Sequence, residues 1–227
     1  MSAALSLEAP SDFELLRQGT AAFVLSLRER GVFDVNVLRA METVPRDFFA
    51  PRRFADLAKS DVALPIACGQ TMTAPTVVAS MLAALEVRPG QRVLEVGTGT
   101  GYVSALLERI GAEVHTIERQ PILADSAARR LQAGGFKGVR LACGDGLEGG
   151  EDQGRYHRIL VNGILPYLSP ALTARIVAGG RLVAGAVLDG TPQLLTIWRD
   201  EEGELSHACG TPVRLSPLVA STDQAQV

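Results

Sequence analysis

Residues 93–102 read VLEVGTGTGY, an apolar run that leads into three glycines at alternate positions. Gly97, Gly99 and Gly101 can adopt positive φ angles and let the backbone approach a ligand without an intervening Cβ. The apolar spacing after Gly101 is helical, and a helix N-terminus carries unpaired N–H groups and a positive partial charge. The stretch therefore predicts a strand, a ligand-binding loop and a helix, in that order.

Two other kinds of glycine loop fit this stretch less well. A dinucleotide-binding loop has the spacing GxGxxG, whereas this loop has GxGxG. Tyr102 stands where the third dinucleotide glycine would fall, and its ring would crowd the packing of the helix on the strand. This weakens the interpretation as an NAD(P) site. A phosphate-binding loop of the GxxxxGK type is absent, because no lysine follows the glycines.

The sequence around the loop alternates between two kinds of pattern. Helical spacing predicts helices over residues 74–87, 102–109, 121–133 and 170–178. Runs rich in β-branched residues predict strands over residues 92–96, 113–117, 139–142, 159–162 and 181–187. This order is typical of an α/β fold with a doubly wound, mainly parallel, Rossmann-like sheet.

The two ends of the chain differ from this middle part. Extended runs over residues 193–199 and 204–215 flank a charged turn and predict an antiparallel C-terminal hairpin. At the other end we expect helices over residues 13–31 and 35–42, and then a loop-rich stretch over 46–66 that prolines interrupt. The organisation predicted is an N-terminal helical and loop arm, residues 1–73, and an α/β domain, residues 74–227, packed as one compact unit.

Composition limits the classes of function. The 227 residues are 47% hydrophobic and have a net charge of −3, which does not suggest a broad cationic surface for nucleic acid. No apolar run approaches the roughly 18 residues that span a bilayer, and residues 1–10 lack the pattern of a signal peptide. Cys68, Cys143 and Cys209 show neither zinc-site nor disulfide-framework spacing. We expect a cytoplasmic protein that binds no nucleic acid, membrane or metal.

Two carboxylates follow the strands next to the glycine loop. Glu118 comes directly after the predicted strand 113–117, where a doubly wound sheet presents a carboxylate to ribose hydroxyls. Asp145 lies between Gly144 and Gly146 after the next strand, where its carboxylate could accept from the exocyclic amine of an adenine. Taken singly, Glu118 could be a solvated side chain and Asp145 part of an ordinary turn. Their occurrence together with the glycine loop favours a nucleoside site.

The glycine loop, Glu118 and Asp145 together resemble the class I S-adenosylmethionine-dependent methyltransferases. The resemblance implies the Rossmann-like methyltransferase fold, with S-adenosylmethionine as cofactor and S-adenosylhomocysteine as product. It further implies that the glycine loop curves around the methionyl part, that Glu118 holds the ribose and that Asp145 holds the adenine. The cofactor-binding residues it implies are Glu95, Gly97, Thr98, Gly99, Gly101, Tyr102, Glu118, Asp145 and Gly146.

Four segments narrow the resemblance to the protein-L-isoaspartate O-methyltransferase family. They are VPRDFFAP at residues 44–51, LPIACGQTMTAP at 64–75, RPGQRVLE at 88–95 and VRLSPL at 213–218. The second of these is the most specific, and the similarity covers about residues 12 to 218. It implies methyl transfer from S-adenosylmethionine to the α-carboxylate of isoaspartyl residues in damaged proteins, which is a repair reaction. Isoaspartyl-containing peptides and proteins would then be the partners.

The same resemblance implies an acceptor site in residues 64–75. Thr73 stands where the family has Ser and is the candidate catalytic residue, which would orient the acceptor carboxylate. Gln70 and Thr71 are candidates for further substrate-binding residues. A carboxylate with a reference pKa of about 3.5 is already ionised at pH 7, so no general base is needed. An alternative role for Thr73 is that of N-cap, because the next predicted helix begins directly after it.

The acceptor half departs from the family pattern at several residues. The departures are Ala67, Cys68, Thr73 and the segment 162–166. Two alternatives stay open on this ground. One keeps the fold and cofactor but has a different acceptor, such as a modified peptide or a small molecule. The other is a non-catalytic relative that binds S-adenosylmethionine and acts through a partner.

Overall fold

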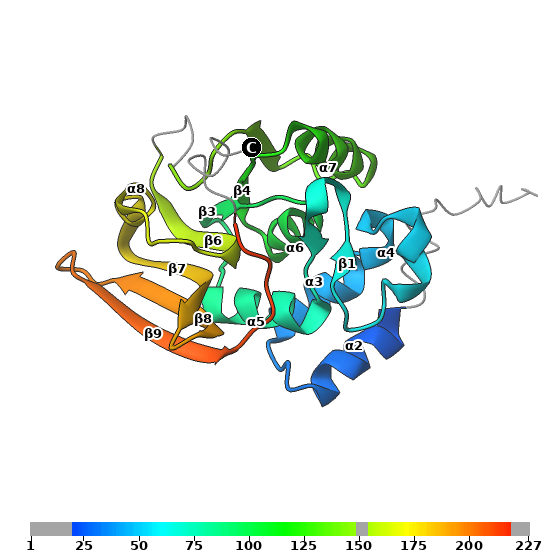
Figure 1. The fold of residues 1–227 in the computed structure, drawn as a ribbon, viewed down its shortest axis with the longest axis horizontal. Helices are drawn as coiled ribbons and strands as arrows, with labels where there is room; N and C mark the ends of the chain where they lie inside the picture. The colour runs from blue at the N-terminus through cyan, green and yellow to red at the C-terminus, as the bar shows by residue number, and fades with distance from the viewer. Residues whose placement is uncertain (1–19, 149–153, 219–227) are drawn as a thin grey trace, which may run out of the picture.

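The computed structural model describes residues 20–148 and 154–218, and their central element is a seven-stranded sheet (Figure 1). The strands of this sheet are β3 (Arg92–Val96), β4 (Glu113–Glu118), β5 (Val139–Cys143), β6 (Tyr156–Ile164), β7 (Ile176–Leu188), β8 (Thr191–Arg199) and β9 (Leu205–Pro212). They lie in the order β5-β4-β3-β6-β7-β8-β9, with parallel pairs as far as β7 and antiparallel pairs beyond it. The predicted mainly parallel sheet with an antiparallel C-terminal hairpin is confirmed.

Side chains alternate along the strands, and this alternation gives the sheet two buried faces. Val93 and Val114 belong to the larger core, which also contains apolar residues of the three longer helices of this region. These helices are α5 (Pro75–Leu85), α6 (Tyr102–Ile110) and α7 (Pro121–Ala133). Leu94 and Ile159 point to the opposite face, where the smaller core includes Leu172 of the short helix α8 (Pro170–Thr173). Most of the helical cover therefore lies on one face.

The segment after α8 differs from the sequence-based prediction. A helix was expected over residues 170–178, but α8 ends at Thr173 and β7 begins at Ile176. The β-branched pair Ile176 and Val177 favours extended backbone, and Gly179 has a left-handed φ of 67°. Tyr156 N donates to Arg175 O at 2.8 Å, so sheet pairing replaces the last turns of the expected helix.

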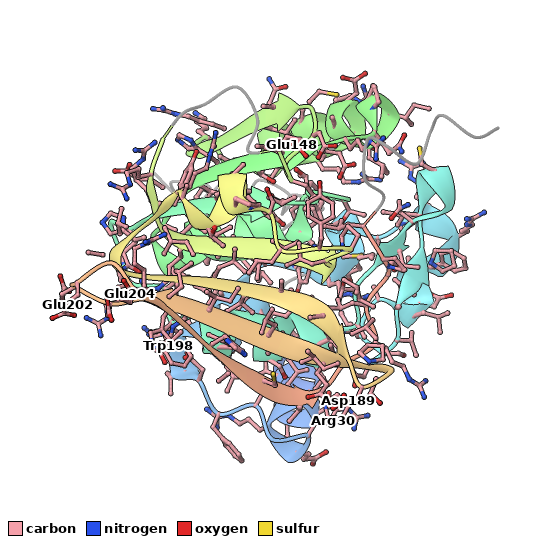
Figure 2. All side chains as sticks on the ribbon, turned by 60° about the vertical axis from the view of Figure 1, so that its left-hand side comes forward. Arg30, Glu148, Asp189, Trp198, Glu202 and Glu204 are labelled. Atoms are coloured by element: carbon pink, nitrogen blue, oxygen red, sulfur yellow. The ribbon has the colours of Figure 1, made fainter. Side chains whose placement is uncertain are left out.

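Tight turns join the three C-terminal strands. Asp189 and Gly190 connect β7 to β8 with φ angles of 50° and 75°, the left-handed pair that favours a two-residue hairpin. The β8–β9 hairpin projects from the body of the molecule, with Glu202 and Glu204 at its tip (Figure 2). This hairpin extends the sheet away from the carboxyl ends of β3 and β4, where the functional candidates lie.

The N-terminal arm consists of short elements. They are α2 (Thr20–Glu29), α3 (Val35–Thr43), α4 (Arg46–Phe49), the 3₁₀ helix η1 (Arg52–Leu57), β1 (Leu64–Pro65), the 3₁₀ helix η2 (Ala67–Gly69) and β2 (Thr71–Met72). The first part of the expected helix 13–31 lies outside the described residues. The stretch 46–66 was expected to be irregular, but it contains the two short helices α4 and η1. Pro45 and Pro51 are their N-caps, and the fixed φ of proline is tolerated at the start of a helix. The ring centroids of Phe49 and Tyr102 lie 5.8 Å apart, and both residues belong to the larger core. The arm and the α/β part therefore share this core.

Arg46 joins the residues before β1 to the residue after β2. It is only 2% exposed, and its guanidinium donates to the carbonyl oxygens of Ala58 at 2.9 Å and Val62 at 3.0 Å. It also donates to Thr73 O at 3.1 Å. Buried backbone carbonyls need hydrogen-bond partners, and this one cation is the donor for carbonyls on both sides of the β1–β2 segment. The backbone of Thr73 is thereby fixed.

Glu95 is a fully buried carboxyl group beneath the glycine loop. It accepts hydrogen bonds from Ser104 Oγ and, at 2.8 Å, from Thr116 Oγ1. Thr98 Oγ1 lies 2.6 Å from Thr116 Oγ1, so the hydroxyl chain runs from the loop to the carboxyl group. Burial raises the pKa of Glu95 to about 8, more than its hydrogen bonds lower it. Glu95 is therefore largely protonated at neutral pH.

Replacement of Glu95 by Gln should flatten the pH dependence of stability. The folded-state pKa of about 8 lies above the ordinary value of 4.5, so between these values the folded protein keeps a proton that the unfolded chain releases. This group's contribution to the free energy of unfolding is full below pH 4.5 and falls as the pH rises towards 8, by up to about 1.4 kcal/mol per pH unit. Urea unfolding of wild type and Glu95→Gln between about pH 5 and pH 8 measures the difference in slope. Equal slopes would refute the assignment.

Candidate functional site

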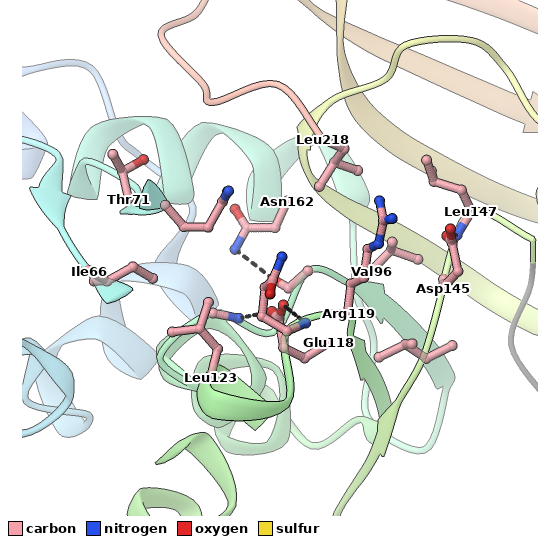
Figure 3. Close-up of a pocket in the computed structure, with 16 residues that line it drawn as sticks. Ile66, Thr71, Val96, Glu118, Arg119, Leu123, Asp145, Leu147, Asn162 and Leu218 are labelled. Carbon is pink, nitrogen blue, oxygen red and sulfur yellow. Dashed lines mark hydrogen bonds between the residues drawn. The ribbon is translucent and has the colours of Figure 1, made fainter. Parts of the chain in front are cut away.

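A pocket opens at the carboxyl ends of β3, β4 and β6 (Figure 3). β3 pairs with β4 on one side and with β6 on the other, so the strand order reverses at β3. Open α/β sheets form their ligand crevice at such a reversal. Figure 3 shows Glu118 near the middle of the pocket, with Thr71 towards one side and Asp145 towards the other.

The glycine loop forms the floor of this pocket. Gly97 and Gly99 have φ angles of 91° and 56°, which β-carbon-bearing residues rarely adopt. A Cβ on Gly97 would lie 3.7 Å from Leu218 Cδ2 and would fill space that now belongs to the pocket. The strand-to-helix turn therefore exposes bare backbone to a ligand.

Glu118 shapes the loop and faces the pocket at the same time. Its Oε2 accepts from Gly99 N at 2.8 Å, and its Oε1 accepts from Gln120 N at 2.9 Å. A carboxylate has about four acceptor sites, so both oxygens keep capacity for a ligand's hydroxyl groups. The side chain is 6% exposed, and an additional hydrogen bond there would be well shielded from water.

Asp145 has one satisfied oxygen and one that lacks a partner. Oδ1 accepts from Leu147 N at 2.9 Å, which closes a tight turn after β5. Oδ2 is buried and has no hydrogen-bond partner within residues 20–148 and 154–218. Next to it, a Cβ on Gly146 would lie 2.7 Å from Val96 Cγ1, so only glycine fits without a shift of the strand. A buried unpaired acceptor is costly, and a ligand that donates a hydrogen bond would satisfy it.

A smaller recess adjoins the pocket on the side of the arm. Thr71, Gly99 and Asn162 line both cavities, whereas Thr73 lines the recess but not the pocket. Thr73 Oγ1 donates to Asn162 Oδ1 at 3.2 Å, and Asn162 Nδ2 donates to Gly97 O at 3.3 Å. Thr71 Oγ1 lies 2.7 Å from Ser216 Oγ, a contact that ties the arm to the segment after β9. The recess is thus polar on the arm side and open to the loop backbone.

The candidate residues from the sequence fall into three groups. Those that line the larger pocket are Gln70, Thr71, Gly97, Gly99, Glu118, Asp145 and Gly146. Those that line the recess are Thr71, Thr73, Thr98, Gly99 and Tyr102. Glu95 and Gly101 line neither cavity, because Glu95 is buried below the loop and Gly101 is the N-cap of α6. These two residues support the loop backbone and do not themselves face either cavity.

The N-cap alternative for Thr73 is wrong. The N-cap of α5 is Ala74, which makes no side-chain capping bond, and Pro75 occupies the first turn. The hydroxyl of Thr73 points instead across to β6, where it meets Asn162. Thr73 therefore belongs to the recess and not to the helix end.

Sequence patterns missed several residues of the pocket. Ile66 and Leu123 contribute apolar walls, and Leu218 closes the pocket from the segment after β9. Leu218 N donates to Ile164 O at 3.0 Å, a long-range pairing that no local pattern signals. Asn162 could have been found, because it ends a predicted strand next to β3 and departs from the small residues of the family pattern.

Other kinds of site have little support in residues 20–148 and 154–218. No three His, Cys, Asp or Glu side chains gather there as a metal site, and none of the helices is long and apolar enough to cross a membrane. The histidines make structural contacts, as in the bond of 3.1 Å between His115 Nδ1 and Tyr156 Oη. His157 Nδ1 accepts from Arg92 N at 3.1 Å.

Comparison with known proteins agrees with this geometry. The model of the protein-L-isoaspartate(D-aspartate) O-methyltransferase family matches residues 18–223. The protein-L-isoaspartate O-methyltransferase of Azorhizobium caulinodans is 40% identical over 210 residues, which are 92% of this chain and 97% of the relative. That of Nitrobacter winogradskyi is 47% identical over 162 residues, 71% of this chain and 75% of the relative.

A solved structure has the same fold. It comes from Plasmodium falciparum, is in complex with S-adenosyl-L-homocysteine, and superposes with a TM-score of 0.76 at 20% identity. The match covers 87% of this chain and 97% of that one. This likeness shows the shared fold, and the family match and the two bacterial relatives show the family: the chain belongs to the protein-L-isoaspartate(D-aspartate) O-methyltransferase family.

Proposed function

We propose that the chain transfers a methyl group from S-adenosylmethionine to the α-carboxylate of isoaspartyl residues in damaged proteins. The observation that carries this proposal is the pairing of two cavities at the glycine loop. One cavity offers Glu118 and the unpaired Oδ2 of Asp145 to a nucleoside, and the other offers Thr73 to an acceptor. Isoaspartyl peptides and proteins are then its substrates.

The pocket residues fit the cofactor by their hydrogen-bonding chemistry. Asp145 Oδ2 needs a donor, and the exocyclic amine of adenine is one. Glu118 accepts from the two ribose hydroxyls through lone pairs that its backbone partners leave open. The order of Asp145, Glu118 and Thr71 across Figure 3 suits a ligand with adenine at one end and a methionyl group at the other.

The reaction requires little from the protein beyond alignment. S-adenosylmethionine supplies an electrophilic methyl group on a sulfonium that leaves as a neutral thioether. The acceptor carboxylate is ionised at pH 7, so no base is needed to remove a proton from it. Thr73 orients the carboxylate, and the walls of the recess exclude water. Such alignment lowers the barrier by several kcal/mol, and the products are a methyl ester and S-adenosylhomocysteine.

We also propose a cytoplasmic location. Cys68, Cys143 and Cys209 are unpaired and exposed. Exposed free thiols suit a reducing compartment, in which disulfides do not persist. Proteins that age in the cytoplasm would supply the acceptors.

The proposal predicts selective methylation of an isoaspartyl peptide. A short synthetic peptide with isoaspartate, labelled S-adenosylmethionine and the purified chain should give a base-labile labelled ester. The control is the same peptide with normal aspartate, which should stay unlabelled. No transfer to the isoaspartyl peptide, with S-adenosylhomocysteine binding verified by calorimetry, would favour a different acceptor or a non-catalytic relative.

A second prediction concerns Asp145. Asp145→Asn keeps an oxygen for Leu147 N but turns an amide N–H₂ towards the place of the adenine amine, so donor faces donor. The affinity for S-adenosylhomocysteine should fall at least about tenfold, because one buried hydrogen bond to the ligand is lost. Calorimetry measures it, and Asp125→Asn on the exposed side of α7 is the control with the same change of charge. Unchanged affinity in Asp145→Asn would remove Asp145 from the adenine site.

A further inference from the structure

Asn162 connects the two cavities through a single amide group. It directly follows Val161, the last residue of β6 that pairs with β3, and it lines both the cofactor pocket and the recess. Its Nδ2 donates to Gly97 O at 3.3 Å, and its Oδ1 accepts from Thr73 Oγ1 at 3.2 Å. It therefore contacts the loop on one side and the acceptor segment on the other.

The orientation of this amide follows from its partners. A backbone carbonyl only accepts hydrogen bonds, so the nitrogen of Asn162 must face Gly97 O. The oxygen then faces Thr73, whose hydroxyl has a single proton to donate. In the ligand-free arrangement that proton is directed at Asn162, and the backbone of Thr73 is held independently by Arg46.

We propose that Asn162 is a positioning residue for the acceptor carboxylate and acts through Thr73. It holds the Thr73 hydroxyl at a fixed place relative to Gly97, and the O–H is shared with a carboxylate that enters the recess. The inference rests on the proposed function, since the carboxylate is that of the isoaspartyl acceptor.

The charge of the acceptor favours this sharing. A hydrogen bond from a hydroxyl to a carboxylate is stronger than one to an amide oxygen. A carboxylate therefore draws the Thr73 O–H towards itself, whereas a neutral amide would not. Asn162 stays anchored to Gly97 O and keeps its contact with Thr73 Oγ1, so the hydroxyl remains aligned with the loop while the methyl group is transferred.

Removal of the amide should lower kcat rather than binding. Asn162→Ala deletes both hydrogen bonds, and Asn162→Leu deletes them at nearly constant volume. Each should lower kcat for the isoaspartyl peptide about tenfold, the size of one hydrogen bond. Binding of S-adenosylhomocysteine, and of the peptide to that complex, should change less than about threefold by calorimetry. The chain's other asparagine, Asn36, is exposed on α3, and Asn36→Ala is the control without effect.

A double-mutant cycle tests whether Asn162 acts through Thr73. In a Thr73→Val background, Asn162→Ala should cause no further loss of kcat. In a Thr73→Ser background, which keeps the hydroxyl, the loss should return. Additive losses would overturn the inference, as would wild-type kcat in Asn162→Leu or weaker peptide binding at unchanged kcat. If the wild-type chain itself does not methylate the isoaspartyl peptide, the proposed function fails, and the inference fails with it.

Discussion

The buried guanidinium of Arg46 is the interaction on which the geometry of the site depends. It binds the carbonyl oxygens of Ala58 and Val62, before β1, and that of Thr73, after β2. A buried arginine without such partners would be strongly unfavourable. These bonds hold Thr73 where its side chain faces Asn162 of β6.

The sheet supplies the other half of the site. The reversal of strand order at β3 brings the glycine loop, Glu118 and Asn162 to the same edge. Beneath that edge, Glu95 and Thr116 support Thr98 through a buried chain of hydrogen bonds. The glycine-loop side is thus a floor of backbone. The segment that faces it is held by the contacts of Thr71 with Ser216, of Thr73 with Asn162 and of Thr73 O with Arg46.

Local sequence patterns predicted most of the fold, and several of their candidates for the cofactor site line one pocket in the structure. The glycine loop, Glu118 and Asp145 each follow the end of a strand, and the short-range pattern that predicts a strand also locates its end. The helix expected over 170–178 was wrong at its end because sheet pairing of Ile176 overrides helical spacing. The partners of Thr73 and Leu218 are distant in sequence, and no spacing rule could identify Asn162 or Ile164 as those partners.

The central claim is that Thr73 and the glycine loop meet around an acceptor carboxylate. A crystal structure of the chain with S-adenosylhomocysteine and an isoaspartyl peptide tests it most directly. The account predicts a carboxylate oxygen within about 3 Å of Thr73 Oγ1, a hydrogen-bond distance, with Asn162 still bonded to Gly97 O. A carboxylate bound outside the recess, without contact to Thr73, would contradict the account.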